Sequence, residues 1–303
     1  MHREIKSFAV SCALILGLFI ANANSTENGL SNYPVGVSTA FNGLLPAPGQ
    51  SYFYNYAQYY KAESFRDSDG KKTIPKFSAE LIVDAPRVVH TWNEPLGPFS
   101  LSTGVIVPLL HVSSTVYGQK EIKNAIGDVI VHPLMIGYSN PSHNFFTFLS
   151  PFDMALPTGS YDKDRIANTG QNHLAFLPNW AVTWFPTPRT EISTALTAEI
   201  YTKNHDTNYQ SGTVVSGEFL LGYSITEKWQ IGIQGFYSKQ VSYDKLDGET
   251  YLDGFRGQSA ALGPQVRYTI SPGVAIVAKY QHDFAVENRS KGDHFWIQYA
   301  FPF

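Results

Sequence analysis

Short segments in which apolar and polar residues alternate restrict the fold of this 303-residue chain more than any other feature. In one of them, Trp229, Ile231 and Ile233 alternate with Gln230 and Gln234. Successive side chains of a β-strand point to opposite faces, so each such segment predicts a strand with one apolar and one polar face. Twelve segments have this character, namely residues 50–60, 77–93, 99–111, 125–138, 144–156, 173–185, 190–201, 212–224, 229–238, 258–270, 274–284 and 293–303.

The connections between these segments alternate in length and in charge. Odd-numbered connections, such as 61–76 and 239–257, are long and rich in charged residues, whereas even-numbered ones, such as 225–228 and 271–273, are short. A soluble β-sandwich has no reason to sort its loops in this way, but a transmembrane barrel has long extracellular loops and short periplasmic turns. We therefore expect an all-β fold, an antiparallel up-and-down transmembrane β-barrel of about 12 strands formed by residues 50–303.

The composition excludes several other classes of protein. Charged residues make up 16% of the chain and aromatic residues 14%, whereas soluble domains carry about 25% charged residues. A chain so poor in charge and rich in aromatic residues is not disordered. The net charge of −3 gives no reason to expect nucleic acid as a partner. The longest uncharged stretches, 129–152 and 166–188, each contain several prolines, which disfavour a membrane-spanning helix.

Residues 1–23 have the three parts of a secretory signal peptide. Arg3 and Lys6 precede the apolar run 8–20, and residues 21–23 follow as a small-x-small cleavage site. The alternative interpretation is an uncleaved N-terminal anchor. The one cysteine of the chain lies within the apolar run, so the mature chain is expected to have neither a disulfide nor a thiolate metal site. We expect export through the Sec pathway to the outer membrane of a diderm bacterium.

The last strand indicates how the barrel is assembled. Apolar residues recur there at every second position up to the end of the chain. Such a strand, ending in Phe, resembles the C-terminal signal that the outer-membrane barrel assembly machinery recognises. That machinery, outer-membrane lipid and lipopolysaccharide are therefore expected partners. The residues of the expected assembly signal are Phe295, Ile297, Tyr299, Phe301 and Phe303.

A more specific resemblance lies near the start of the expected mature chain. Residues 33–36 read Tyr-Pro-Val-Gly, and residues 46–49, Pro-Ala-Pro-Gly, lead into a segment with five tyrosines between positions 52 and 60. This start resembles that of the outer-membrane protein family associated with the phenol meta-degradation pathway, the MetA-pathway or SphA-like family. The resemblance implies a barrel for the uptake of hydrophobic compounds, encoded with catabolic genes for aromatics or lipids. It implies no particular catalytic or binding residues.

Residues 24–49 contain too many prolines and glycines to form a strand. Two interpretations remain open for this N-terminal segment. It is either a loose periplasmic tail or a partial plug that folds into the lumen. A channel for hydrophobic substrates needs such an obstruction to avoid an open leak.

The polar face of the strands predicts the lining of the lumen. If Ile192, Trp229, Ile276 and Phe301 face lipid, polar residues of the opposite parity face inward. This inward set contains both acids and bases, so many of these charges are expected to pair across a narrow lumen. The lumen-facing candidates are Glu191, Glu199, Glu218, Gln230, Gln234, Gln265, Arg267, Lys279, Gln281 and Gln298.

Between residues 99 and 185 the alternation is blurred, because apolar residues occur on both faces. Inward aromatic and methionine side chains in this region are expected either to line a path for a small hydrophobic solute or to contact the N-terminal segment. A twelve-stranded lumen is narrower than that of a porin, which suits a small substrate. The candidates for an apolar path are Phe145, Phe146, Phe148, Phe152 and Met154.

No motif of the chain supports an enzyme. G-x-S-x-G, H-E-x-x-H, Walker A and G-x-G-x-x-G are all absent. His111 and Ser113 resemble the His-x-Ser pair of outer-membrane phospholipase, but the Asn-Gly expected after that serine is missing, as is an orienting third group. Residues 67–70 lack the remaining ligands of a calcium loop, and the histidines lack metal-ligand spacing. We therefore expect no catalysis, no cofactor and no metal.

Two classes of function remain. The first is an outer-membrane channel for passive uptake of small hydrophobic or aromatic compounds that feed a catabolic pathway. The second is a structural or adhesive barrel without transport. A general porin and an outer-membrane lipase are weaker alternatives. The aromatic-rich middle third and the N-terminal segment favour transport, whereas an adhesin is expected to have longer or repetitive loops.

Overall fold

The structure, a computed structural model, describes residues 31–38 and 40–303. The predicted signal peptide, 1–23, and residues 24–30 of the predicted N-terminal segment lie outside the described residues. Within the described ranges there is no helix long and apolar enough to cross a membrane.

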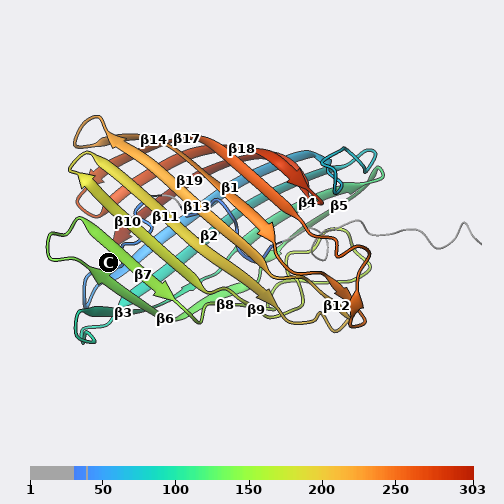
Figure 1. Ribbon diagram of the computed structural model, residues 1–303, viewed down its shortest axis with the longest axis horizontal. Coiled ribbons are helices and arrows are strands. Elements are labelled where there is room, and N and C mark those ends of the chain that lie inside the picture. The colour runs from blue at the N-terminus through green and yellow to red at the C-terminus, as the bar shows by residue number, and fades with distance from the viewer. Residues whose placement is uncertain (1–30, 39) are drawn as a thin grey trace, which may run out of the picture.

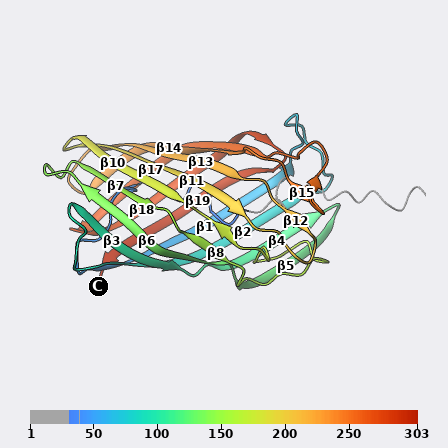
Figure 2. The same cartoon turned by 60° about the horizontal axis from the view of Figure 1, so that its bottom comes forward.

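In the described part of the chain, sixteen strands form one antiparallel sheet. The sheet closes into a barrel (Figures 1 and 2). Closure occurs where the last strand pairs with the first, with Phe301 opposite Phe53 and Phe295 opposite Tyr59. Four pairs of consecutive strands each continue one strand of the wall past a short break, so the wall is twelve strands around. The predicted fold class is confirmed. The wall strands are β1 (Ser51–Phe65), β2 (Ser78–Thr91), β3 (Phe99–Ile106) with β4 (Leu109–Val116), β5 (Gln119–Ile126) with β6 (Val129–Ser139), β7 (Phe145–Ser150) with β8 (Met154–Leu156), β9 (Ala175–Phe176) with β10 (Asn179–Thr187), β11 (Thr190–Tyr201), β13 (Val214–Ser224), β14 (Trp229–Gln240), β17 (Gln258–Ser271), β18 (Val274–Glu287) and β19 (Ser290–Pro302).

The four breaks lie in four neighbouring strands of the wall and form two adjacent pairs. The backbone N–H of Gly127 donates to the carbonyl of Pro108, and that of Leu177 donates to the carbonyl of Asp153. Proline accounts for three of the breaks, since it has no N–H to donate to a sheet ladder. The breaks are residues 107–108, 127–128, 151–153 and 177–178.

One connection differs from the sequence-based expectation. Residues 112–124 are predicted to be a loop, but they lie mostly in β4 and β5, which meet at Tyr117 and Gly118. Gln119, Lys120 and Glu121 give this hairpin the polarity of a loop. Its inner positions face the lumen rather than lipid, so polar residues are compatible with the strand.

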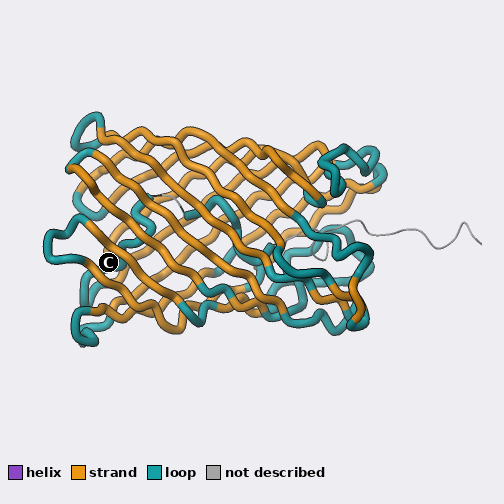
Figure 3. The backbone as a smooth tube through the Cα atoms, viewed as in Figure 1, coloured by secondary structure: helices purple, strands orange, loops and turns teal. Residues whose placement is uncertain are grey.

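The two ends of the barrel differ in the length of their connections (Figure 3). At one end, here called the turn end, the connections are short and the chain finishes at Phe303. At the other, the loop end, lie the longer connections 66–77, 157–174, 202–213 and 241–257. The alternation of long and short connections that the sequence predicts is therefore found for most of the connections.

Among the described residues β5 pairs only with β4, so the other edge of this hairpin has no strand partner. The connection 157–174 lies along the free edge of β5 instead. The Thr169 hydroxyl donates to the Ile126 carbonyl at 3.0 Å, and the Ile166 N–H donates to a Glu121 carboxylate oxygen at 2.9 Å. Asp128, in the break before β6, accepts the N–H groups of Gly159 and Gln171. Side chains, rather than a backbone ladder, close the wall here.

The outer face of the wall carries the apolar residues that the alternation predicts. Ile233 on β14 is 57% exposed on this face, whereas the adjacent Gln234 is fully buried on the inner face. Large apolar side chains that remain exposed on a closed barrel suit contact with lipid. On β14, therefore, the residues that face outward and inward are those that the alternation in the sequence predicts.

Substitution of Ile233 tests this assignment. Arginine near the bilayer midplane costs about 2–4 kcal/mol on the lipid-facing side of a barrel. Ile233→Arg is therefore expected to lower the free energy of unfolding by that amount in guanidinium titrations of the refolded barrel in lipid vesicles. Ile233→Leu is the matched control and should change it little. An equal stability of the two variants would contradict a lipid-facing Ile233.

Three very short strands form a second small sheet at the loop end: β12 (Tyr209–Gln210), β15 (Lys245–Leu246) and β16 (Glu249–Thr250). A buried carboxylate joins the two connections that carry them. Oδ1 of Asp244 accepts the Gly212 N–H and the Gln240 amide, both at 2.6 Å, and Oδ2 accepts the Tyr209 hydroxyl. Burial is the main reason that the pKa of Asp244 is raised to about 6.

This carboxylate gives the loop cluster a pH dependence. Because its pKa is higher in the folded cluster than in the unfolded chain, the folded form binds more protons between pH 4 and 6. Its stability should therefore rise as the pH falls through 6 and be lower at pH 7.5, by up to about 3 kcal/mol. Hydrogen exchange of residues 241–257, corrected for intrinsic rates, should show greater protection at pH 4.5 than at pH 7.5. Asp244→Asn should abolish the difference; equal protection of the unmodified protein at both pH values would contradict it.

Candidate functional site: the lumen and its N-terminal segment

Residues 31–38 and 40–49 lie inside the barrel, from its loop half to its turn end. Tyr33 contacts Glu199, close to the loop end of β11, and Phe41 contacts Glu191, at the turn end of the same strand. The N–H of Gly49 then donates to the Thr91 carbonyl at the end of β2. The segment reaches β10, β11, β13, β18 and β19, so it crosses the lumen rather than following one side of it.

Three inward glutamates, Glu191, Glu199 and Glu218, accept hydrogen bonds from backbone N–H groups of this segment. Glu199 accepts the N–H of Tyr33 at 3.0 Å and the hydroxyl of Ser31 at 2.6 Å. Glu218 accepts the N–H of Gly36 and the hydroxyl of Tyr33. Charge-assisted bonds of this kind are stronger than bonds between neutral groups. A segment without regular structure thereby satisfies its N–H groups inside the barrel.

Strands β18 and β19 supply the donors. The ammonium of Lys279 donates to the carbonyls of Gly36 and Val37, the second at 2.9 Å, and the Gln298 amide donates to the same Val37 carbonyl at 2.7 Å. Gln281 donates to Gly36 at 3.2 Å. Residues 36–37 are thus held between acceptors on β13 and donors on β18 and β19.

Glu191 and Arg267 form a buried ion pair in the wall of the lumen. The guanidinium Nη1 of Arg267 lies 2.5 Å from Oε2 of Glu191, and both side chains are almost wholly buried. The same carboxylate accepts the Gln230 amide at 2.9 Å and the Phe41 N–H at 2.7 Å. The Phe41 ring also lies 3.9 Å from the guanidinium carbon of Arg267. This cluster fixes the turn-end part of the segment.

All ten lumen-facing candidates lie buried on the inner side of the wall, but they act in different ways. Gln234 accepts the amide of Gln281 at 2.6 Å, so these two belong to a hydrogen-bond network within the wall. Gln265 has no hydrogen-bond partner for either side-chain atom among the described residues. The buried set is Glu191, Glu199, Glu218, Gln230, Gln234, Gln265, Arg267, Lys279, Gln281 and Gln298.

Two apolar clusters inside the barrel also include side chains of the segment. Tyr33 packs against the cluster around Ile130, Leu177 and Tyr201, and Leu45 packs against the cluster of Val89, Met135, Phe148, Ala181 and Ala195. Gly43 makes the closest approach to the wall. A Cβ at this position would lie 2.3 Å from the Phe146 carbonyl oxygen, so only glycine fits.

The candidate apolar path is not continuous. Phe148 is buried against Leu45, and the Phe146 ring packs edge-on against Phe185 on the same inner face. Phe145 and Met154, however, lie opposite Trp184 and Phe176, which are exposed on the outer face. Phe152 is itself 57% exposed, in the break after β7. The alternation is blurred because the inner face packs against the N-terminal segment while the outer face meets lipid, so both need apolar residues.

The tyrosines of β1 were noted in the sequence for the family resemblance, but not as part of the lumen. Tyr52, Tyr54 and Tyr56 share the inner face of β1, and the rings of Tyr54 and Tyr56 are parallel, with centroids 6.4 Å apart. Arg87 of β2 lies opposite Tyr54, with its guanidinium carbon 5.5 Å from the ring centroid. Parity is the signal for this ladder, since these tyrosines alternate with Phe53, which lies opposite Phe301 of the apolar face.

A second inward group links β6 to the break after β7. Nδ1 of His132 lies 2.7 Å from Asp153, which also accepts the hydroxyl of Ser150. In a hydrolytic triad the serine bonds to the histidine, but here the aspartate lies between them. His111 of the His-x-Ser pair is not bonded to Ser113 through Nδ1 either. Its Nδ1 lies 2.6 Å from Oδ1 of Asn124. In the described residues, no three His, Cys, Asp or Glu side chains are grouped to hold a metal ion.

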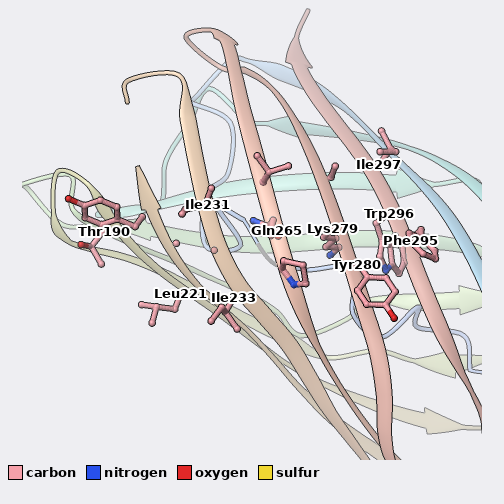
Figure 4. A pocket seen from close by; sticks show the side chains of 16 residues that line it. Thr190, Leu221, Ile231, Ile233, Gln265, Lys279, Tyr280, Phe295, Trp296 and Ile297 are labelled. Atoms are coloured by element: carbon pink, nitrogen blue, oxygen red, sulfur yellow. The ribbon is translucent and has the colours of Figure 1, made fainter. Parts of the chain in front are cut away.

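The residues of the expected assembly signal all lie exposed on the outer face of the last strand or at its end. Beside them is a largely apolar hollow of about 920 Å³ on the outside of β13, β14, β17, β18 and β19 (Figure 4). Leu221, Ile231 and Ile233 project into it from the lipid-facing side. The hollow is therefore separate from the lumen and belongs to the lipid-facing surface.

Comparison with known proteins agrees with this architecture. A family model described as the putative MetA-pathway of phenol degradation matches residues 62–299. The COG4313 outer membrane channel from Pseudomonas putida F1 has a similar structure, with a TM-score of 0.77 and 17% identity over 88% of this chain and 100% of that one. The CymD monoaromatic hydrocarbon channel is more distant, with a TM-score of 0.45 and 9% identity over 85% of this chain and 89% of that one. None of the curated proteins matches this chain.

Proposed function

Because this chain belongs to the family described as the putative MetA-pathway of phenol degradation, we propose that it is an outer-membrane channel for passive uptake of small aromatic or hydrophobic compounds. These compounds feed a catabolic pathway. The loop end faces the outside of the cell and the turn end faces the periplasm, which is the usual orientation of outer-membrane barrels.

The observation that carries this proposal is the construction of the lumen. A closed barrel is lined by buried polar side chains, and a chain segment held by Glu199, Glu218 and Lys279 crosses its interior. A structural or adhesive barrel has no need of such an obstruction, because its task lies in its loops. A channel for small solutes gains selectivity from it, since the segment narrows the passage.

The same proposal includes the remaining expectations about the chain. Residues 1–23 direct export through the Sec pathway and are removed, and residues 24–49 act as a partial plug. Outer-membrane lipid and lipopolysaccharide contact the outer face, and the barrel assembly machinery recognises the strand that ends at Phe303. The chain acts as a channel rather than as an enzyme.

Solute uptake by whole cells tests the proposal. The full-length protein is produced in a porin-deficient diderm host, and entry of radiolabelled phenol, benzoate and sucrose is measured against the empty vector. Faster entry of the aromatic compounds without faster entry of sucrose is the expected result. Equal acceleration of all three would favour a general porin. No acceleration, with the barrel detected in the outer membrane, would favour a barrel without transport.

A further inference from the structure

We infer that Arg87, Tyr54 and Tyr56 form a binding site in the lumen for an aromatic carboxylate. This inference deepens the proposed function, on which it rests, because it names the class of solute that the lumen holds. Its starting point is a difference between two inward guanidinium groups. Arg267 is paired with Glu191 at 2.5 Å, whereas Arg87 forms no ion pair with any carboxylate of the described residues.

Arg87 has no direct carboxylate partner, although the charge of Asp153 is near enough to act on it. Nη1 donates to the hydroxyl of Tyr56 at 3.2 Å, and Nη2 lies 3.7 Å from the sulfur of Met135. Its Nε is buried and has no partner in the described part of the chain. The acid of this region, Asp153, is engaged by His132 and Ser150. Moving an unpaired cation away from water is costly, and a bound anion would offset that cost.

The anion has to be planar and aromatic to use the whole site. A carboxylate accepts two parallel hydrogen bonds from a guanidinium, which a point charge does not. The parallel rings of Tyr54 and Tyr56 provide a stacking surface directly beside Arg87. The three side chains are only partly buried, and Tyr54 also packs against the cluster of Val89, Met135 and Phe148. The proposed solute would meet them from the lumen.

The charge also separates two kinds of aromatic solute. A simple phenol titrates near pH 10, as tyrosine does, and is neutral at pH 7. An aromatic carboxylate is ionised at that pH and supplies the direct carboxylate partner that Arg87 lacks among the described residues. Benzoate is therefore the probe that the site should prefer over benzyl alcohol, which lacks the charge, and over cyclohexanecarboxylate, which lacks the aromatic ring.

Binding to the full-length protein in detergent tests the inference. Saturation-transfer NMR titrations with benzoate are compared for the unmodified protein and for Arg87→Gln, Arg87→Lys and Tyr54→Leu. Loss of the charged hydrogen bonds in Arg87→Gln should weaken binding about tenfold or more. Arg87→Lys should lie between the two, because it keeps the charge but not the paired donors. The matched control is Arg256→Gln, since Arg256 lies 5.2 Å over the Tyr243 ring in the loop cluster, outside the lumen.

Two results would overturn the site: equal benzoate binding by the unmodified protein and Arg87→Gln, or equally strong binding of benzyl alcohol and benzoate. The comparison of the three probes on the unmodified protein decides the question even if a variant does not assemble. If benzoate binding depends on Arg87 but cells take up no aromatic compound, the proposed function is refuted while the binding site is still supported. Uptake of aromatic compounds without an effect of Arg87→Gln on binding would refute the site alone.

Discussion

Deletion of residues 31–48 is expected to raise the single-channel conductance of the protein severalfold. The described part of this segment bonds to Thr183 on β10 and to Gln298 on β19, which lie six strands apart in the twelve-stranded wall. Without them the passage should widen toward that of an unobstructed twelve-stranded barrel, which lies between eight-stranded barrels and porins in diameter. Recordings of the purified variant in planar bilayers measure the change.

The deletion needs a control for assembly. Heat-modifiable gel mobility should show that the shortened chain still forms a barrel, because β1 begins at Ser51, after the deleted residues. Glu218→Gln is the matched point variant. It weakens one anchor but keeps the segment, so its conductance should be closer to that of the unmodified protein. An unchanged conductance of a correctly folded deletion variant would refute the role of the segment as an obstruction.

The buried pair of Glu191 and Arg267 carries the largest expected effect on stability. Removing one partner leaves the other charge buried without compensation, which costs about 3–5 kcal/mol. Glu191→Gln is therefore expected to lower the free energy of unfolding by about this amount. The double variant Glu191→Gln, Arg267→Gln should recover much of the loss, because neither charge then remains. Guanidinium titrations of the refolded barrel measure both values.

An exposed ion pair provides the contrast. Lys61 and Glu63 lie 3.1 Å apart at the surface, where solvent screens the charges. Glu63→Gln should therefore have no measurable effect on stability. If Glu191→Gln were equally harmless, the pair with Arg267 would be solvated rather than buried.

The sequence contains most of the information on the wall of the barrel. The alternation of Ile233 with Gln234 assigns them to opposite faces without any knowledge of the fold, because lipid and lumen differ sharply in polarity. The same reasoning selects the ten lumen-facing candidates, and all ten are buried in the structure. It fails where both faces have similar polarity. Phe145 and Phe146 are both apolar, and periodicity alone does not tell which of them meets lipid.

The partners of the inward residues require the register of the folded barrel. Glu191 and Arg267 are 76 positions apart and meet only because β11, β13, β14 and β17 are neighbours in the wall. Arg87 was missed because β2 carries charge on both faces. Asp84 of the same strand lies on the outer face, where it accepts a hydrogen bond from Asn55 at 2.6 Å. A strand with such a mixed pattern does not indicate which charge is functional.

The free edge of β5 gives the barrel a region that differs in kind from the rest of its wall. Elsewhere, backbone groups join neighbouring strands, and that bonding is the same for almost any sequence. Along β5 the corresponding bonds end on the side chains of Glu121, Asp128 and Thr169. The seal between lumen and lipid is therefore under the control of individual residues at this one place. A point substitution at one of these residues therefore changes the seal without any change in strand number or topology.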